Sequence, residues 1–513
     1  MRTKPRYLTL PFISLMLLFG CNGDPGPAGE SVHNSPVSTG DPSCPYGGSE
    51  LVAGGTTTYA CNGAPGDSVT IASLAPSEDQ NCPTGGSVFT TTGGQTSYAC
   101  HGRQGPVGPQ GASPYINVKS YGATGDGSTD DTEAIQAAVD SLAGSGGIVF
   151  VPTGTYMVQA VSNGISLGNH TTLWLTPGAM LKAIPNSSQS YAVVLVEDVT
   201  GVSIIGGTIA GERDEHTGVD GQWGMGISIR SATNVLIEDV TIRDCWGDGI
   251  YVGFGSSNIS ANVKIRGVLV DHNRRQGLSI VSCSGCTVEA STFSGNAGQA
   301  PQAGIDLEPN SDTGPVEDTR ITGNLFVKNG YGLLLAAQNA PVERTTVTGN
   351  TFTDNFIDGI RLFLASGNTV SNNVIRRSGN HGIAIYGRLN EQTEEFAHDN
   401  IVANNIVEGS DEIGISLFYT IDNVVSGNLI VGSGQSETPE KNDNLALRFS
   451  ARNSVQGNTM RLGSYSVQPR FGIFVTDTST DNVVSNNDLY HAGATAAFMD
   501  QGVGTVVLGG NRQ

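Results

Sequence analysis

The sequence has few charged and few aromatic residues. Charged residues make up 14% of its 513 positions and aromatic residues 6%, and only three Trp are present. The formal net charge of -21 excludes non-specific binding to nucleic acid, because the protein and the phosphates would repel each other. An anionic substrate is not excluded, since a local groove can be basic on an acidic protein. The acidity also suits Ca²⁺ as a cofactor, but no EF-hand loop is present.

Long apolar runs are absent beyond the N-terminus, so no second segment is expected to span a bilayer. Near the N-terminus, basic residues precede the apolar run 8–19, as in an export signal. The end of this run resembles a bacterial lipobox. The resemblance implies a lipoprotein signal peptide over 1–20, with Cys21 as the lipidated residue. It also implies an outer-membrane or cell-surface location with a lipid anchor as the membrane contact, because Asn22 rather than Asp follows. A plain signal peptide is the alternative.

Cysteine is also scarce, and four of the eight cysteines bracket two similar segments. Each segment opens with Cys-Pro and closes with Tyr-Ala-Cys, which predicts the disulfides Cys44–Cys61 and Cys82–Cys100 in an exported chain. Zinc binding is the weaker alternative, because no CxxC pair or His set lies nearby. Short Gly-x-y triplets flank the segments but are too few for a collagen triple helix. We expect residues 21–112 to form a flexible, disulfide-containing stalk.

A different pattern begins at Tyr115. Residues 121–140 read YGATGDGSTDDTEAIQAAVD, and residues 146–156 read GGIVFVPTGTY. Asp130 or Asp131 can cap a helix over 132–142, and a strand follows. This stretch resembles the N-terminal cap of the pectate-lyase-like superfamily, which contains rhamnogalacturonases, alginate epimerases and phage tailspikes. The resemblance implies a parallel β-helix with a short capping helix and a polysaccharide as the substrate class. It implies no particular reaction.

The rest of the chain is periodic. A Gly before an apolar-x-apolar strand recurs at positions 226, 249, 277, 304, 332, 359, 382 and 414. A Gly-Asn or Asn-Asn pair recurs in register with it, as at Gly349-Asn350 and Asn372-Asn373. Such repeats without helical periodicity predict one all-β, right-handed parallel β-helix over 113–513, with Asn side chains stacked as a ladder. A propeller or a leucine-rich repeat is the alternative, but neither signature motif is present.

Alignment of the coils on the recurrent Gly predicts columns of outward-facing residues. The column two residues after Gly is Ser228, Tyr251, Ser279, Asp306, Leu334, Arg361, Ala384 and Ser416. Coils in such a stack lie about 4.8 Å apart, so this column and its neighbours form one patch. The patch contains these charged and polar residues: Asp248, Tyr251, Arg274, Arg275, Gln276, Asp306, Glu308, Asp358, Arg361 and His381.

Carboxylates in this patch have the spacing of a glycosidase. Asp306 and Glu308 alternate on one strand, with Cα atoms about 6.5–7 Å apart, and Asp248 lies about 10 Å along the axis. Inverting glycosidases place their acid and their base about 6.5–9.5 Å apart. Asp306, Glu308, Asp248 and Arg275 are therefore the candidate catalytic residues. Arg275 and its neighbour Arg274 also allow β-elimination or C5 epimerisation, because both reactions neutralise a uronate carboxylate and need a base.

Further residues near the patch are candidates for substrate binding. They are Tyr251, Arg274, Gln276, Trp223, Trp246, Arg361 and His381. Each Trp can stack on a sugar ring or be buried at a corner. An inserted loop with Asp214, Glu215 and His216 precedes the patch and can be solvated, catalytic or metal-binding, and the metal stays unknown.

Finer family patterns are missing. The polygalacturonase pattern of paired Asp followed by GHG and RIK is absent, and Asp248 precedes Tyr251, unlike the Tyr-x-x-Asp-x-His arrangement of alginate epimerases. The resemblance therefore carries fold and substrate class but no mechanism. Cys283 and Cys286 can close a small disulfide and leave Cys245 buried.

The sequence thus predicts a surface-anchored carbohydrate-active enzyme that hydrolyses a polysaccharide in the groove of the β-helix. A uronate lyase or C5-epimerase is the first alternative. A non-catalytic carbohydrate-binding surface protein is the second. The oligomeric state is left open.

Overall fold

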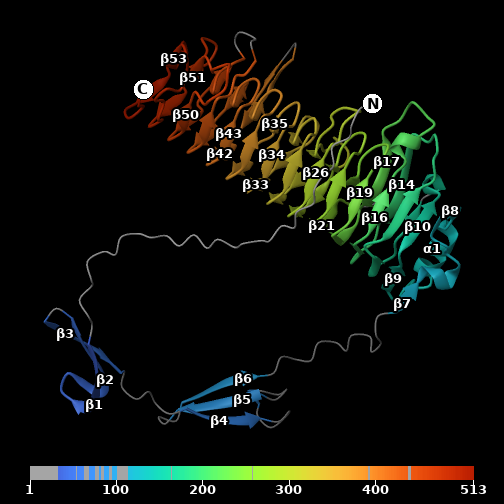
Figure 1. Cartoon of the computed structure of the whole chain (residues 1–513), viewed down its shortest axis with the longest axis horizontal. Coiled ribbons are helices and arrows are strands. Elements are labelled where there is room, and N and C mark those ends of the chain that lie inside the picture. The colour runs from blue at the N-terminus through green and yellow to red at the C-terminus, as the bar shows by residue number, and fades with distance from the viewer. Residues whose placement is uncertain are drawn as a thin grey trace, which may run out of the picture. The chain divides into compact units, whose positions relative to one another are not determined.

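The computed structural model describes residues 33–512, apart from 54, 63–68, 75–79, 82–85, 92–94, 101–113, 163, 257, 391–392 and 437–440 (Figure 1). The chain forms two compact units, residues 1–110 and 111–513. The predicted signal peptide, the lipidation of Cys21 and the Cys82–Cys100 disulfide involve residues outside this description. In the described part, no helix has the length and apolar character needed to cross a membrane.

The first unit contains two small antiparallel sheets. The first sheet is built from β1 (His33–Asp41), β2 (Cys44–Ala53) and β3 (Thr56–Cys61). The second consists of β4 (Val69–Leu74), β5 (Gly86–Thr91) and β6 (Thr96–Cys100). The predicted disulfide between Cys44 and Cys61 is confirmed and joins the start of β2 to the end of β3. The two similar sequence segments therefore form similar hairpins, which the expectation of a flexible stalk did not include.

The second unit begins with the predicted cap. Helix α1 spans Thr132–Asp140, two residues shorter than expected, and buries Ile135 and Val139 against the first coils. Asp130 accepts a hydrogen bond from the Thr132 backbone N–H at 3.0 Å, as a capping residue would. The Asp131 carboxylate instead accepts from the backbone N–H groups of the preceding turn, residues 124–125, at 2.6 and 3.1 Å. Asp131 therefore fastens the turn to the helix rather than capping it.

The remainder is a parallel β-helix in which each coil contributes strands to three long sheets. Figure 1 shows the strands of successive coils stacked on one another. We call the first sheet the site sheet. Its strands, in spatial order, are β11 (Ile165–Ser166), β14 (Ser190–Glu197), β17 (Trp223–Arg230), β20 (Ile250–Gly253), β23 (Leu278–Ile280), β27 (Ile305–Leu307), β31 (Leu333–Ala336), β35 (Ile360–Phe363), β38 (Ile383–Tyr386), β44 (Ile415–Phe418), β48 (Leu445–Arg448), β51 (Phe471–Val475) and β53 (Ala496–Asp500).

The other two sheets complete each coil. The second sheet contains β8 (Asp126–Asp130), β10 (Gly154–Val158), β13 (Ala179–Ala183), β16 (Thr208–Ala210), β19 (Thr241–Arg243), β22 (Leu269–Asp271), β26 (Thr292–Ser294), β30 (Leu325–Val327), β34 (Thr351–Thr353), β37 (Val374–Arg376), β43 (Ile406–Glu408), β47 (Leu429–Val431) and β50 (Thr459–Arg461). The third contains β7 (Tyr115–Asn117), β9 (Gly147–Val151), β12 (Thr171–Leu175), β15 (Ser203–Ile205), β18 (Thr233–Glu238), β21 (Ser260–Arg266), β24 (Cys283–Ser284), β25 (Thr287–Glu289), β28 (Val316–Glu317), β29 (Arg320–Thr322), β32 (Val342–Glu343), β33 (Thr346–Thr348), β36 (Thr369–Ser371), β42 (Ile401–Ala403), β46 (Val424–Ser426), β49 (Ser454–Gln456), β52 (Val483–Ser485) and β54 (Val506–Leu508).

Aliphatic side chains from all three sheets fill the interior of the coil. A short stack of aromatic rings supplements them, because β26, β30 and β34 place Phe293, Phe326 and Phe352 directly above one another. Their ring centroids are 5.3 and 4.5 Å apart, and all three side chains are fully buried. The interior is therefore packed with side chains, so any ligand must bind on the outer face of a sheet.

The predicted Asn ladder is confirmed, and the structure explains its two-residue marker. In each pair the first residue has a left-handed backbone, with φ of 67° at Gly349 and 55° at Asn372. The second residue is buried at the turn, where Asn350 Nδ2 donates to Asn373 Oδ1 at 3.0 Å and Asn373 Nδ2 donates to Asn405 Oδ1 at 3.0 Å. The left-handed geometry therefore belongs to the first residue of the pair, and the ladder belongs to the second.

Candidate functional site

The backbone register of the site sheet reproduces the predicted column residue by residue. Each member pairs with the next across neighbouring strands: Ser228, Tyr251, Ser279, Asp306, Leu334, Arg361, Ala384 and Ser416. The candidate residues therefore belong to consecutive coils on one face.

Arg275 connects the predicted catalytic carboxylates. Its guanidinium lies 3.0 Å from Asp248 and 3.6 Å from Glu308. Asp248 is fully buried and also accepts a hydrogen bond from the Ser279 hydroxyl at 2.7 Å. Burial raises the pKa of Asp248, and the charge of Arg275 opposes that rise. The Glu308 side chain is 29% exposed, so it is the carboxylate of this group that reaches solvent.

Asp306 lies beneath this surface. It is fully buried, and its Oδ2 accepts a hydrogen bond from Gln276 Nε2 at 2.8 Å. Its Oδ1 has no protein partner. Burial, followed by the charge of Glu308, raises the pKa of Asp306 well above its ordinary value. Gln276 is itself fully buried and holds Asp306, and its role in substrate binding stays a prediction.

A groove of about 520 Å³ lies over the first half of this patch. Tyr251, Arg275 and Glu308 line it together with Trp223, which is 45% exposed. Arg230 also lines the groove, and its guanidinium lies 4.4 Å from the centre of the Tyr251 ring. Trp223 and Tyr251 therefore line the groove beside two cations and one acidic side chain.

Trp246 and Arg274 do not face the groove. The Trp246 ring is sandwiched between His216, at 3.8 Å between centroids, and the Arg274 guanidinium, at 3.7 Å. Arg274 also donates to the backbone carbonyl oxygen of Gly221 at 2.8 Å. Both faces of the indole are covered, so Trp246 cannot stack on a sugar in this arrangement, whereas Arg274 lines a separate hollow together with Trp223. They fasten the inserted loop to the coil behind it.

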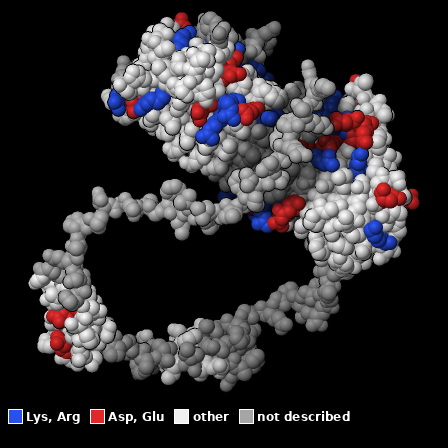
Figure 2. All heavy atoms as spheres, viewed as in Figure 1, with Lys and Arg blue, Asp and Glu red and all other residues white. Residues whose placement is uncertain are grey.

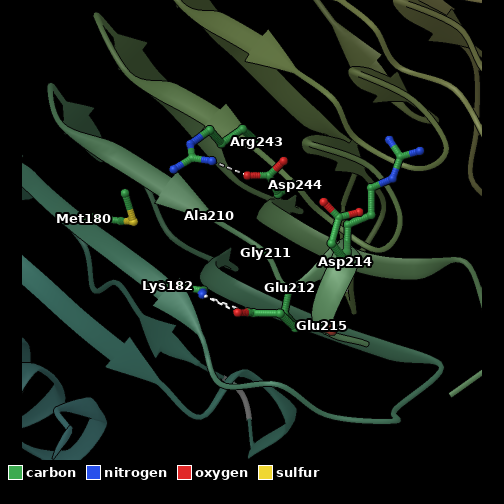
Figure 3. A pocket seen from close by; sticks show the side chains of 10 residues that line it. Met180, Lys182, Ala210, Gly211, Glu212, Asp214, Glu215, Arg243 and Asp244 are labelled. Carbon is green, nitrogen blue, oxygen red and sulfur yellow. Dashed lines mark hydrogen bonds and ion pairs between the residues drawn. The ribbon is translucent and has the colours of Figure 1, made fainter. Parts of the chain in front are cut away.

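The inserted loop borders a second hollow, which lies over the second sheet (Figure 3). Lys182 of β13 pairs there with Glu215 at 2.7 Å, and Arg243 of β19 pairs with Asp244. Asp214, Asp244 and His272 bring ligand-type atoms within 4.8 Å of one another. Asp244 already holds His272 and Arg243, so its oxygens are engaged.

The side chain of His216 is fully buried, unlike that of a solvated loop residue. Its Nδ1 lies 3.0 Å from the buried Glu212 carboxylate. Tyr191 donates to the same carboxylate. The loop is therefore a packed structural element: Glu212 is bonded to Tyr191 of the site sheet, whereas Asp214 and Glu215 line the hollow over the second sheet.

Arg361 and His381 belong to a second polar cluster farther along the site sheet. Arg361 Nε lies 2.5 Å from the buried Asp358, and the Tyr386 hydroxyl lies 2.5 Å from His381 Nε2. Burial lowers the pKa of His381 to about 3 and raises that of Tyr386 to about 12. Burial also raises the pKa of Asp358 to about 6. The Nε2 atom of the neutral His381 ring can accept a hydrogen bond from the Tyr386 hydroxyl.

The predicted disulfide between Cys283 and Cys286 is confirmed, and Cys245 is a buried free thiol. Burial raises the pKa of Cys245, which disfavours the reactive thiolate. The cysteines of this region are therefore structural.

Three residues of the site were not singled out from the sequence. Arg230 and Tyr386 stand in the column four residues after the recurrent Gly, and Ser279 stands in the same column as Asp306. Their positions in the repeat could be read from the sequence, but a Tyr, a Ser or an Arg at such a position is equally typical of a side chain that only faces solvent. Only the contacts with Tyr251, His381 and Asp248 distinguish them.

Charge on the β-helix is mixed rather than single-signed. In the face shown in Figure 2, Lys and Arg side chains lie beside Asp and Glu side chains. Pairs such as Arg377–Asp354, at 2.7 Å, account for this arrangement. The net charge of -21 is thus compatible with local basic positions such as Arg230 and Arg275.

Comparisons with known families cover most of the second unit. The family described as "Rhamnogalacturonase A/epimerase, pectate lyase-like" matches residues 115–202, and "Right handed beta helix region" matches 189–344. "Periplasmic copper-binding protein (NosD)" matches 310–435 and 392–511. These matches confirm the predicted right-handed β-helix.

Individual relatives share parts of the chain. "Uncharacterized protein YclG" of Bacillus subtilis is 33% identical over 44% of this chain and 45% of its own length. "Mannuronan C5-epimerase AlgE5" of Azotobacter vinelandii is 27% identical over 68% of this chain and 37% of its own length. The chain thus spans less than half the length of these curated relatives.

A solved structure shows the same fold. The A-module of mannuronan C-5 epimerase AlgE4 of Azotobacter vinelandii aligns with a TM-score of 0.54 and 20% identity. The alignment covers 77% of this chain and all of that module.

Proposed function

We propose that this protein cleaves a polysaccharide in the groove over the site sheet by acid–base hydrolysis. The premise is that the chain is a right-handed parallel β-helix protein of the pectate-lyase-like superfamily. A carbohydrate-active β-helix agrees with its similarity to a mannuronan C5-epimerase. The groove supports a substrate with carboxylate groups, because Arg230 and Arg275 both line it.

The observation that carries this proposal is the contrast between Asp306 and Glu308. They alternate at the end of one strand but have opposite environments. Asp306 is buried with a raised pKa, which favours the protonated form that donates to the leaving oxygen. Glu308 is partly exposed and lies 3.6 Å from the Arg275 cation, so its side chain is placed to activate a water molecule from solvent. Two carboxyl groups in such contrasting environments can divide the roles of acid and base.

Substrate access to Asp306 requires a movement of side chains. Asp306 is fully buried in the free protein, whereas Arg275 and Glu308 lie at the groove. Both covering side chains are long, and substrate carboxylates compete for Arg275 with Glu308. Binding of a uronate to Arg275 would therefore release Glu308 and open the path to Asp306 Oδ1, the oxygen without a partner. Asp248 acts as a positioning residue that keeps Arg275 in place.

The pH dependence of kcat/KM should show the acid role of Asp306. Its pKa is raised, so the proton it donates is present at low pH and is lost as pH rises through the raised pKa. Arg275 opposes that rise, so Arg275→Gln is expected to move the alkaline limb to higher pH. The control Arg243→Gln removes an exposed cation of the second sheet and should leave the limb in place. A limb that stays in place or moves to lower pH in Arg275→Gln would contradict the assignment.

A second candidate reaction is β-elimination on a uronate polymer. It is favoured by the 2.5 Å contact between Tyr386 and neutral His381, since a neutral imidazole can take the C5 proton of a sugar while the tyrosine hydroxyl donates its proton to the leaving oxygen. Arg361, 5.0 Å from the centre of the Tyr386 ring, would neutralise the uronate carboxylate. This reaction would use the second polar cluster instead of Asp306 and Glu308.

A panel of neutral and uronate polysaccharides tests the two reactions against each other. Hydrolysis releases reducing ends without ultraviolet absorbance, whereas elimination creates an unsaturated, absorbing sugar at the new non-reducing end. We expect reducing ends without absorbance, from a uronate-containing polymer. Absorbance that depends on Tyr386 would favour elimination. Binding of the polymer without either product would show a non-catalytic carbohydrate-binding protein.

A further inference from the structure

A separate hollow lies near the C-terminal end of the site sheet. It has a volume of about 490 Å³, which is within the range of small-ligand sites. We call this hollow the distal pocket. Its wall contains four phenylalanines and two arginines, with Asp477 and three uncharged polar residues beside them. The phenylalanines and arginines are Phe418, Arg448, Phe449, Arg470, Phe471 and Phe474. None of these residues belongs to the groove or to the cluster around His381.

The distal pocket lies on the same face as the candidate catalytic residues. The register leads from Asp306 through Leu334, Arg361, Ala384 and Ser416 to Ala446, in five strand-to-strand steps. At about 4.8 Å a step, these positions are separated by roughly 24 Å along the axis. A polymer that follows the site sheet from the groove would therefore pass over the pocket.

The two arginines of the pocket differ in how well they are paired. Arg470 donates to both oxygens of the buried Asp443, at 3.1 and 2.9 Å, and is neutralised by it. Arg448 approaches the same carboxylate at 3.9 Å only. Its Nε and one Nη group are buried and have no acceptor. Buried guanidinium donors without an acceptor are costly, so Arg448 offers unused hydrogen-bonding capacity for an anionic group.

Aromatic rings stand beside Arg448 at the turns that follow the site-sheet strands. Phe449 is 40% exposed, and its backbone φ is 49°, a left-handed value that is rare for a bulky residue. Its ring stacks on that of Tyr419, whose φ is 52°, at 4.7 Å between centroids. The same left-handed turn follows the site-sheet strand on other coils, as at Ser231 and Leu364, so it belongs to the repeat. Here it presents an apolar ring next to the unpaired donors of Arg448.

A chain of contacts joins the second polar cluster to this pocket. The Arg361 guanidinium lies 5.0 Å from the Tyr386 ring, and Tyr386 lies 5.4 Å from the Phe418 ring. Phe418 in turn contacts Phe449 at 5.7 Å between centroids. Arginines and aromatic rings thus continue along one face from the cluster to the distal pocket.

We propose that the distal pocket is a non-catalytic subsite that binds one anionic sugar unit of the polysaccharide, with its acidic group on Arg448 and its ring against Phe449. The pocket would anchor a long substrate while another part of the same chain lies at Glu308. This extends the proposed function by adding a length requirement, since only an oligosaccharide that bridges roughly 24 Å occupies both places. A carboxylate and a sulfate ester share the chemistry that Arg448 recognises.

The test measures binding alone, so it does not depend on cleavage. Oligogalacturonates of increasing length are titrated by calorimetry into the full chain carrying Glu308→Gln, with and without Arg448→Gln. Methyl-esterified oligomers and sulfated galactan oligomers form two further arms. We expect Arg448→Gln to weaken binding of long acidic oligomers by about 10- to 100-fold, as for loss of a charge-assisted hydrogen bond. Short oligomers should be unaffected.

Control variants separate recognition from folding. Arg448→Lys keeps the charge but not the forked donors, so it should retain part of the affinity and fold as the parent does. Phe449→Ala should weaken the binding of long oligomers without changing the preference for acidic over esterified oligomers. Arg376→Gln removes an exposed arginine of the second sheet and should change nothing.

The arms have distinct readings. Preference for the sulfated oligomers, lost in Arg448→Gln, would identify sulfate as the recognised group. Equal binding of acidic and esterified oligomers, or equal affinity in parent and Arg448→Gln for every length, would overturn the proposal. Length-dependent binding through Arg448 in a protein that cleaves none of the polysaccharides would support the subsite and refute hydrolysis.

Discussion

Replacing Glu308 with Gln is expected to lower kcat by about 10²- to 10⁴-fold, the usual contribution of a general acid or base. The amide has nearly the shape of the carboxylate but cannot take a proton from water. Glu308 is partly exposed, and its contacts with Arg275, at 3.6 Å, and Gln338, at 3.3 Å, are at the surface. The substitution should therefore leave the fold intact, and the loss should appear in kcat rather than in KM.

Asp306→Asn is the partner experiment. Its side chain accepts a hydrogen bond from Gln276, and an amide oxygen can replace that acceptor. If both carboxyl groups act, each single variant should lose activity to a similar extent, and the double variant should lose little more, because the pair works as a unit. Kinetics on the polysaccharide identified from the panel, with circular dichroism to check folding, make the measurement.

Glu343→Gln is the matched control, since Glu343 is a partly exposed glutamate paired with Arg344 on the third sheet. It should retain parental kcat. Turnover of Glu308→Gln within a few-fold of the parent would remove Glu308 from the mechanism. A large loss in Glu308→Gln combined with full activity in Asp306→Asn would refute the carboxyl pair while leaving Glu308 as a single acid or base.

Replacing Asn373 with Ala is expected to destabilise the β-helix by about 2–5 kcal/mol. Asn373 Oδ1 accepts from both the backbone N–H and the Nδ2 of Asn350, at 2.9 and 3.0 Å. Its Nδ2 donates to Val347 O and Asn405 Oδ1, each at 3.0 Å. The side chain is 1% exposed, so water cannot replace these contacts without entering the turn. Buried groups on both neighbouring coils would lose a partner at once.

The neighbouring residue is the control for this experiment. Asn372 is exposed and has φ of 55°, which Gly adopts without strain, so Asn372→Gly should change stability by about 0.5 kcal/mol or less. Guanidinium titration followed by circular dichroism compares the midpoints, and the m-values show whether the same surface unfolds. Equal midpoints for Asn373→Ala and the parent would show that the ladder adds no net stability.

The repeat could be predicted from the sequence because it depends on local residue patterns. A Gly followed by an apolar-x-apolar strand marks one turn of the coil, and the distance to the next such Gly marks the register. The structure therefore pairs Tyr251 with Ser279 and Ser279 with Asp306, as the alignment on Gly predicted. The Asn ladder follows from the same repetition, as does the disulfide between the neighbouring cysteines at 283 and 286.

The roles of single side chains were less predictable. Trp246 and Arg274 have the composition of a sugar platform, but each covers the other, and His216 covers the remaining face of the indole. Gln276 and Asp248 each precede a recurrent Gly, and both are buried. Gln276 holds Asp306, whereas Asp248 holds Arg275. The distal pocket gave no sequence signal, because Phe418, Arg448 and Phe471 lie on three different coils and become neighbours only when the coils stack.

The sequence by itself determined the coil, its repeat, the face on which the polar residues gather and the residues that share a column. These properties depend on alternation along a strand and on turns that recur at nearly constant spacing, which are local rules. Only the tertiary structure decided which of those residues reach the groove. Asp306 and Glu308 differ by two positions and share a face, but burial and the approach of Arg275 depend on side chains from other coils. Burial and charge of this kind set protonation and access, so they separate a buried acid from an exposed carboxylate where the sequence shows two similar residues.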